Sequence, residues 1–222
     1  MKAIQLFLIL TITLSSVNLE KKHIMLCLGD SYTIGESVEE HERFPMQAVE
    51  LLKKDGISID KPIIIAKTGW TTDELAAAIK EKNLQGKYDY VTLLIGVNNQ
   101  YRNRDAEEYR KEFDALLKTA LNYADGKAEH VFVISIPDWG ATPFGLKDNN
   151  RTPEQIGKEI DHFNAINKQE SLKAKVNYID ITPGSRKAKQ DPELVAGDGL
   201  HPSGKMYGDW ARLLAEEIKK HL

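Results

Sequence analysis

Short apolar runs recur along the chain from about residue 23 onward, and longer amphipathic stretches separate them. Within each run the apolar positions are continuous rather than alternating with polar ones. This pattern is typical of strands that are buried on both faces of a parallel sheet. The runs predict five strands, at residues 23–28, 63–67, 90–95, 130–136 and 176–181.

The stretches between these runs contain residues that favour the start of a helix. Thr71 followed by Glu74 has the spacing of a capping box, in which each side chain bonds the backbone N–H of the other residue. Comparable signals are Pro45, Asp105 with Glu108, Thr152 with Pro153 and Gln155, and Ser203. Strand and helix alternate five times, which predicts an α/β domain with a parallel sheet covered by helices on both sides.

The first eighteen residues do not follow this pattern. Lys2 precedes an apolar stretch over residues 3–14, and small and polar residues occupy positions 15–18. This layout is typical of a secretory signal peptide, and the apolar stretch is shorter than the ~20 residues that cross a bilayer. We therefore expect a signal peptide over residues 1–18, a single domain over residues 19–222, and a secreted or periplasmic rather than cytoplasmic protein. A first strand or an uncleaved membrane anchor is the alternative interpretation.

Composition narrows the classes of function. The chain has 30 Lys and Arg against 33 Asp and Glu, a net charge of −3, whereas nucleic-acid-binding proteins are normally strongly basic. The single cysteine, Cys27, excludes an internal disulfide and any thiolate-rich metal site. The histidines lack the spacing of metal ligands. We expect no metal, no nucleic-acid partner and no stable membrane span, while the oligomeric state stays open.

The ends of the predicted strands carry residues that are able to do chemistry. In open α/β sheets, ligands bind beyond the carboxyl ends of the strands. The residues at these ends, and just before the last predicted helix, are Gly29, Asp30 and Ser31, Gly69 and Trp70, Asn98 and Asn99, Asp138 and Trp139, and Asp198 and His201. Each alone has a simple structural explanation, such as a helix cap or a tight turn. Their joint occurrence at one expected edge points to a shared site.

Together these residues supply the roles that acyl transfer requires. The Ser31 hydroxyl needs a base within hydrogen-bond reach. His201 can take its proton, and Asp198, three residues earlier, can hold the imidazole in the required tautomer. The backbone N–H groups of Ser31 and Gly69 and the side-chain amide of Asn98 can then bind the oxyanion. The sequence predicts a serine esterase.

The order of these motifs resembles that of the SGNH hydrolases, also called GDSL esterases and lipases. Gly-Asp-Ser, then Gly, then Gly-x-Asn, then Asp-x-x-His span nearly all of the chain that follows the expected signal peptide. The resemblance implies a flavodoxin-like three-layer α/β/α sandwich with a five-stranded parallel sheet, and hydrolysis without a cofactor. It assigns the triad to Ser31, Asp198 and His201, and the oxyanion hole to Ser31, Gly69 and Asn98.

One position departs from the family pattern, because Asn99 stands where an aspartate is common. The departure leaves open the hydrogen bonding and charge beside the oxyanion hole. Trp70, Tyr101 and Trp139 follow strand ends and are weaker candidates for substrate binding, since packing beneath loops explains aromatic residues equally well.

The sequence leaves one rival class and the choice of ester open. A non-catalytic protein on the same fold would bind a flavin or phosphate at the loop of residues 31–33, or a carbohydrate at a degenerate site. The pair Asp198 and His201 favours the esterase, because phosphate binding does not require it. The substrate is a small-molecule or glycan ester: a lysophospholipid or other lipid-type ester, a thioester, an aryl ester or an acetylated polysaccharide.

Overall fold

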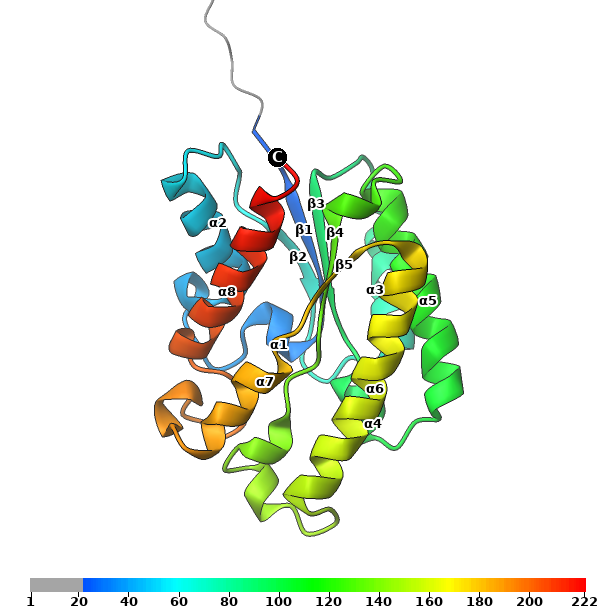
Figure 1. Ribbon diagram of the computed structural model, residues 1–222. Helices are drawn as coiled ribbons and strands as arrows, with labels where there is room; N and C mark the ends of the chain where they lie inside the picture. Colours follow the sequence, from blue (N-terminus) through cyan, green and yellow to red (C-terminus); the bar gives the residue numbers. More distant parts are fainter. Residues whose placement is uncertain (1–21) are drawn as a thin grey trace, which may run out of the picture.

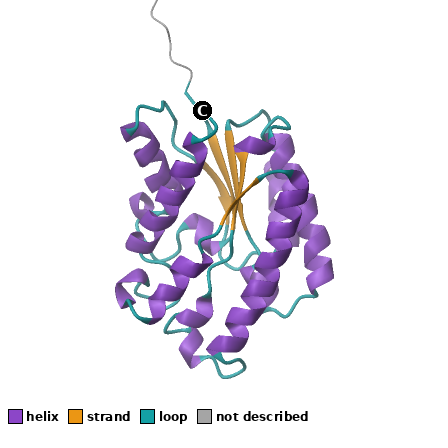
Figure 2. Ribbon diagram, viewed as in Figure 1, coloured by secondary structure: helices purple, strands orange, loops and turns teal. Residues whose placement is uncertain are grey.

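Five parallel strands form the central layer of the protein (Figures 1 and 2). The computed structural model describes residues 22–222, so the expected signal peptide lies outside the described residues. The strands are β1 (Met25–Gly29), β2 (Ile63–Ala66), β3 (Tyr90–Leu94), β4 (Val131–Ile134) and β5 (Asn177–Ile179). Their order in the sheet is β2-β1-β3-β4-β5, and every neighbouring pair is parallel. This is the flavodoxin-like order, which confirms the predicted fold class.

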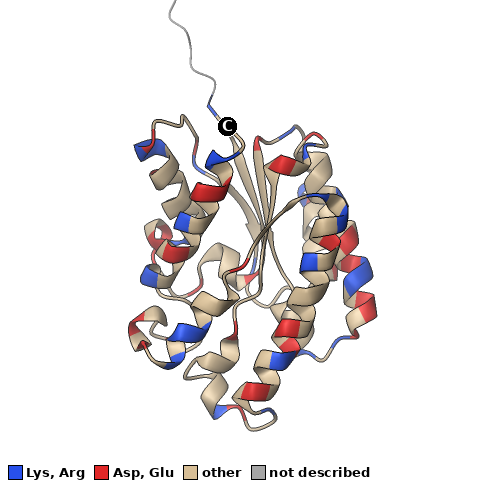
Figure 3. Ribbon diagram, in the orientation of Figure 1, with Lys and Arg blue, Asp and Glu red and all other residues tan. Residues whose placement is uncertain are grey.

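Helices cover both faces of the sheet and complete three layers. The helices are α1 (Ser31–Ile34), α2 (Phe44–Lys54), α3 (Thr72–Lys82), α4 (Val97–Tyr101), α5 (Ala106–Tyr123), α6 (Pro153–Ala174), α7 (Thr182–Ser185) and α8 (Gly204–Lys219). In Figure 1, α2 and α8 lie on one side of the sheet and α3, α5 and α6 on the other. Acidic and basic residues are interspersed along the outer helices, as expected of solvated surfaces (Figure 3). Within residues 22–222, no helix combines the length and the apolar character that a bilayer crossing requires.

The helix-start signals of the sequence are confirmed. Thr71 and Glu74 form a capping box at the start of α3, and Thr152 forms another with Gln155 at the start of α6. The Asp105 carboxylate accepts hydrogen bonds from two backbone N–H groups in the first turn of α5. Caps of this kind typically stabilise a helix by ~1 kcal/mol, because they satisfy N–H groups that have no partner within the helix.

The fourth strand is shorter than the apolar run predicts. Ile136, the last residue of the predicted strand, exchanges two hydrogen bonds with the side chain of Asn164 on α6: its N–H donates at 2.8 Å and its C=O accepts at 2.9 Å. The amide of Asn164 thus replaces a neighbouring strand, so the ladder of β4 ends at Ile134 although the run continues. The edge strand β2 also differs from the expectation of burial on both faces, since Ile63 is 39% exposed.

The carboxyl ends of the strands meet at one edge of the sheet, where α1 and α4 begin (Figure 1). The long connection between β4 and α6, residues 137–151, crosses the same edge. It is joined to the loop of the expected catalytic pair, because the N–H of Phe144 donates to the C=O of Gly199 at 2.9 Å. The fold therefore assembles the expected site residues from five separate parts of the chain.

Candidate active site

The turn from β1 into α1 places Ser31 at the edge of the sheet. β1 ends at Gly29, where a side chain would collide with Thr33 and with the C=O of Leu94. Asp30, rather than Ser31, is the N-cap of α1, since its carboxylate accepts the N–H of Tyr32 at 3.0 Å. Ser31 is thereby the first residue of α1, and its hydroxyl is not used for capping.

Asp30 is fully buried beside this serine. Burial raises the pKa of the Asp30 carboxyl to about 7, although the hydrogen bond from the Tyr32 N–H lowers it. Its second oxygen, Oδ2, has no hydrogen-bond partner among the residues that the structure describes. The turn therefore holds a carboxyl group whose charge is costly near neutral pH.

Asp198 and His201 form a hydrogen-bonded pair on the loop before α8. Nδ1 of His201 lies 2.6 Å from Oδ2 of Asp198, and the imidazole is buried. The other carboxylate oxygen, Oδ1, accepts the backbone N–H groups of Leu200 at 2.9 Å and His201 at 3.0 Å. The Asp-x-x-His spacing thus closes a turn that fixes both side chains relative to the backbone.

A further hydrogen bond on Asp198 comes from a residue that the sequence analysis did not single out. The hydroxyl of Ser37 donates to Oδ2 of Asp198 at 2.6 Å, across 161 positions of sequence. Partial burial would by itself raise the pKa of Asp198, but the hydrogen bonds from Ser37, His201 and the two backbone N–H groups outweigh it. Together they hold the pKa well below the usual range of an aspartate. Asp198 is therefore ionised throughout the neutral range.

Gly69 and Asn98 lie on the loops that follow β2 and β3. Gly69 adopts a φ of +86°, a left-handed conformation that favours glycine, and its C=O accepts a guanidinium hydrogen bond from Arg102 at 2.6 Å. Asn98 is the second residue of α4, and its Nδ2 donates to the C=O of Trp70 at 3.0 Å. This bond uses one of the two amide hydrogens and fixes the orientation of the side chain.

A cavity of about 220 Å³ brings these groups together. Four of the expected catalytic and oxyanion residues line it, namely Ser31, Gly69, Asn98 and His201. Asp198 lies behind His201, outside the lining. The remaining wall is largely apolar, and consists mainly of Tyr32, Val97, Tyr101, Trp139, Phe144 and Leu200.

The three aromatic candidates have different positions. Tyr101 and Trp139 line the cavity and contact each other with their ring centroids 5.5 Å apart. Trp70 does not belong to the lining, and its partly buried side chain packs against the hydrophobic core. Its backbone C=O is the part that reaches the site, as the acceptor for Asn98. Phe144 lines the cavity as well, so the connection over residues 137–151 lies over the site.

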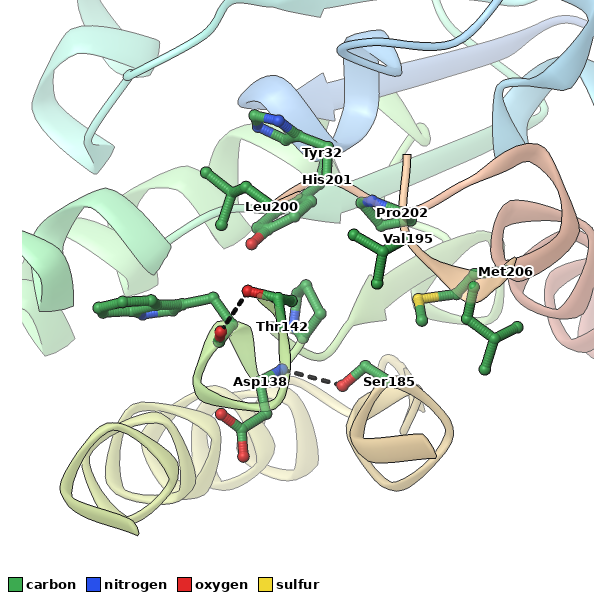
Figure 4. A pocket seen from close by; sticks show the side chains of 12 residues that line it. Tyr32, Asp138, Thr142, Ser185, Val195, Leu200, His201, Pro202 and Met206 are labelled. Carbon is green, nitrogen blue, oxygen red and sulfur yellow. Dashed lines mark hydrogen bonds between the residues drawn. The ribbon is translucent and has the colours of Figure 1, made fainter. Parts of the chain in front are cut away.

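A second, much smaller cavity adjoins His201 (Figure 4). Its volume is about 10 Å³, comparable to that of a single water-sized probe. Tyr32 lies between the two cavities, lines both, and packs edge-on against His201 with ring centroids 5.6 Å apart. This side chain supports the imidazole from one side, and the small cavity has no room for a substrate.

Asn99 has a structural explanation in this protein. Its side chain is buried, accepts the N–H of Thr72 at 3.1 Å, and donates to the Thr72 hydroxyl at 2.6 Å. That hydroxyl in turn donates to the carboxylate of Glu112. An amide supplies both the acceptor and the donor that this position needs, so Asn99 joins the start of α3 to α4 and α5.

Within residues 22–222, no group of three or more His, Cys, Asp or Glu side chains is arranged to hold a metal ion.

Comparisons with known proteins show the family to which the chain belongs. Residues 27–208 match the GDSL-like lipase/acylhydrolase family. An acetylxylan esterase from Geobacillus stearothermophilus is 23% identical over 159 residues, which covers 68% of each protein. The crystal structure of Axe2, an acetylxylan esterase from the same organism, has a TM-score of 0.67 at 20% identity, over 88% of this chain and 94% of that one. The structure of TesA has a TM-score of 0.69 at 14% identity, over 90% of this chain and 99% of that one.

The family match covers most of the chain, and its residues include Ser31, Gly69, Asn98 and both members of the Asp198–His201 pair. The chain therefore belongs to the GDSL-like lipase/acylhydrolase family and is a carboxylic ester hydrolase.

Proposed function

We propose that the protein hydrolyses esters through an acyl-enzyme on Ser31, with His201 as general base and acid and Asp198 as the residue that orients the imidazole. The observation that carries this proposal is the shared cavity. Ser31 and His201 line it together, while Asp198 binds Nδ1 of His201 from behind at 2.6 Å. A histidine that donates through Nδ1 presents Nε2 as an acceptor, which is the tautomer that a serine nucleophile requires.

The steps follow from this arrangement. Nε2 of His201 takes the hydroxyl proton of Ser31 as Oγ attacks the ester carbonyl carbon, and the carbonyl electrons move onto oxygen. The tetrahedral intermediate collapses, the C–O bond to the alcohol breaks, and His201 returns the proton to the leaving alkoxide. Water then attacks the acyl-enzyme with His201 again as base, which releases the carboxylic acid and restores Ser31.

The oxyanion of each tetrahedral intermediate needs donors that are in place before the reaction. We assign this role to the backbone N–H groups of Ser31 and Gly69 and to the second amide hydrogen of Asn98. The support is that all three residues line the cavity and that Trp70 holds the Asn98 amide through its first hydrogen. Loss of one such donor typically lowers kcat by ~10²–10³.

The cavity favours an ester with a short acyl group. Its volume of about 220 Å³ is below the ~300–1,000 Å³ typical of pockets that enclose drug-sized ligands. The relative from Geobacillus stearothermophilus is an acetylxylan esterase. We therefore propose an acetylated carbohydrate, rather than a long-chain lipid ester, as the substrate class, and export of the protein to where such glycans occur.

Labelling with a fluorophosphonate, followed by peptide mapping, tests the mechanism. We expect a covalent adduct on the peptide containing Ser31 of the folded protein, and none in Ser31→Ala. Folded protein without an adduct at Ser31 contradicts the proposal. A series of 4-nitrophenyl esters then tests the acyl group: kcat/KM should be highest for acetate and fall with chain length. A maximum at eight or more carbons would show that the acyl site is larger than the cavity.

A further inference from the structure

A polar groove adjoins the cavity lined by Ser31 and His201, which we call the catalytic cavity, and the two meet at Tyr101. The residues that define this groove are Tyr101, Asn103, Asn150, Arg151, Gln155 and Glu159. Its volume is about 480 Å³, roughly twice that of the catalytic cavity, and Asp148 also lines it. Tyr101, which is 45% exposed, lines both spaces, so the two share this side chain as a wall.

The groove is held in place by a chain of polar contacts that begins at the wall of the catalytic cavity. The indole N–H of Trp139 donates to Oε1 of Gln100 at 2.8 Å, and Nε2 of Gln100 donates to Glu159 at 2.6 Å. Gln100 is 2% exposed, so this connection runs through the interior. Arg151 closes the chain: its Nε lies 3.3 Å from Glu159, and its guanidinium donates to the C=O of Tyr101 at 3.0 Å. The groove is thus a preformed surface joined to Trp139.

The charges of the groove exclude an anionic ligand. Arg151 is the only cationic residue in the lining. Its guanidinium already pairs with Glu159, donates to Asn103, and lies over the Tyr101 ring at 5.8 Å. A phosphate or carboxylate would meet no unpaired cation there, and would lie near Asp148 as well.

The polar lining also excludes an acyl chain, which gains free energy only by burying apolar area. Exposed amide groups of Asn103, Asn150 and Gln155 provide donors and acceptors of the kind that neutral hydroxyl-rich ligands require. The apolar part of the site is confined to the catalytic cavity, next to Val97 and Phe144. The acyl group and the alcohol therefore have separate surfaces.

We propose that the Tyr101 groove binds the neutral saccharide that carries the ester, on the side of the leaving alcohol. This inference rests on the proposed esterase function and adds a binding site to it. Tyr101 separates the two parts of the substrate, since its ring lines the cavity and the groove at once. Trp139, fixed by Gln100, forms the adjoining wall and keeps Tyr101 in position through their 5.5 Å ring contact.

The test compares two esters that share an acyl group and differ in the alcohol. We measure kcat/KM for an acetylated xylo-oligosaccharide and for 4-nitrophenyl acetate in the wild type, in Asn150→Trp, and in the matched control Asn149→Trp. Asn149 is the neighbouring residue, is also exposed, and lies outside the groove. Thermal unfolding confirms that each variant is folded, and Asn150→Lys replaces Asn150→Trp if the latter is not.

We expect Asn150→Trp to lower kcat/KM for the oligosaccharide by about tenfold, mainly through KM, because it fills the groove and removes hydrogen bonds to sugar. Activity on 4-nitrophenyl acetate should change less than about twofold, and Asn149→Trp should leave both unchanged. Equal effects of Asn150→Trp and Asn149→Trp overturn the assignment of the groove. A selective loss of lysophospholipid hydrolysis in Asn150→Trp instead overturns the saccharide as its ligand. If the wild type fails to hydrolyse 4-nitrophenyl acetate and Ser31 is not labelled, the esterase mechanism itself fails.

Discussion

Removal of the Ser37 hydroxyl should slow catalysis although Ser37 does not line the catalytic cavity. Asp198 accepts four hydrogen bonds, from Ser37, from Nδ1 of His201, and from the backbone N–H groups of Leu200 and His201. Ser37 and the imidazole share the same oxygen, Oδ2. Loss of the Ser37 hydroxyl removes one of the two hydrogen bonds that hold this oxygen beside the imidazole, so the effect should appear at His201.

The size of the effect follows from the exposure of the carboxylate. A buried hydrogen bond to a charged group contributes ~1.5–3 kcal/mol, and full loss of the triad carboxylate in serine hydrolases costs about 10⁴ in kcat. The Asp198 side chain is 31% exposed, so water partly replaces the lost donor. Three hydrogen bonds also remain. We therefore expect the activation free energy to rise by about 1 kcal/mol, which is a roughly fivefold loss of kcat, with KM unchanged.

Two substitutions of Ser37 distinguish the effect of losing the hydroxyl from the effect of the backbone conformation. Ser37 has a φ of +65°, a conformation that costs a residue with a side chain about 1 kcal/mol and costs glycine little. Ser37→Gly and Ser37→Ala should lose the same fraction of kcat for 4-nitrophenyl acetate, because both lack the hydroxyl. Only Ser37→Gly should regain stability through relief of the backbone. If kcat of Ser37→Gly stays at the wild-type value, the hydroxyl does not position the Asp198–His201 pair for catalysis.

The contribution of the Ser37–Asp198 hydrogen bond to the free energy of unfolding should depend on pH. The pKa of Asp198 is lowered in the folded protein, so its contribution is present above the unfolded pKa of an aspartate and is lost as pH falls through the folded value. The gain in stability of Ser37→Gly over Ser37→Ala must therefore be measured at neutral pH, far above the pKa of Asp198. In acid, the contribution of the Ser37 hydroxyl to stability should decrease.

Three further predictions concern buried groups near the site. Asn99→Asp should lower the free energy of unfolding at pH 8 by about 1–3 kcal/mol in urea titrations, because the single hydroxyl proton of Thr72 cannot serve two carboxylates. The double variant Asn99→Asp with Glu112→Gln should recover most of this loss. Equal stability of Asn99→Asp and the double variant would contradict this reasoning. For Asp30, the folded pKa of about 7 exceeds the unfolded value of 3.8, so the wild type should lose stability between about pH 4 and pH 7, by at most about 1.4 kcal/mol per pH unit. Asp30→Asn should remove this slope, and parallel curves for the two proteins would refute it. Burial raises the pKa of Cys27 to about 12, so a disulfide reagent should modify it only in denaturant, and rapid reaction of the native protein would show that the thiol is accessible.

The parts of the fold that depend on local signals could be predicted from the sequence. Apolar runs mark all five strands, most clearly the central strands β1, β3 and β4, because both faces of a central strand exclude polar residues. The capping boxes at α3 and α6 are complete within four residues. The end of β4 could not be predicted, because it depends on Asn164, which lies 28 residues away and replaces a strand neighbour. No local pattern distinguishes this asparagine from one on a solvated helix face.

The candidate site follows the same division between local and distant contacts. Asp198 and His201 are close because they lie three positions apart on one turn, so their pairing was predictable from the spacing. Ser37 reaches the same carboxylate across 161 positions, and an isolated serine in a loop carries no signal of such a contact. Trp70 shows the converse: its place after β2 predicted a substrate contact, whereas its side chain packs inward and its backbone C=O orients Asn98.

The proposed saccharide groove at Tyr101 would allow an esterase with a small acyl site to favour a large alcohol without a deeper acyl pocket. Binding energy that an enzyme gains from distant parts of a substrate can hold the reacting carbonyl in place, provided that the binding surface is rigid relative to the nucleophile. The chain from Trp139 through Gln100 and Glu159 to Arg151 provides that rigidity, because it ties the groove to the wall of the catalytic cavity through a buried amide. A substitution of Gln100 that interrupts these hydrogen bonds should therefore lower the hydrolysis of the oligosaccharide more than that of 4-nitrophenyl acetate, although Gln100 lines neither the cavity nor the groove.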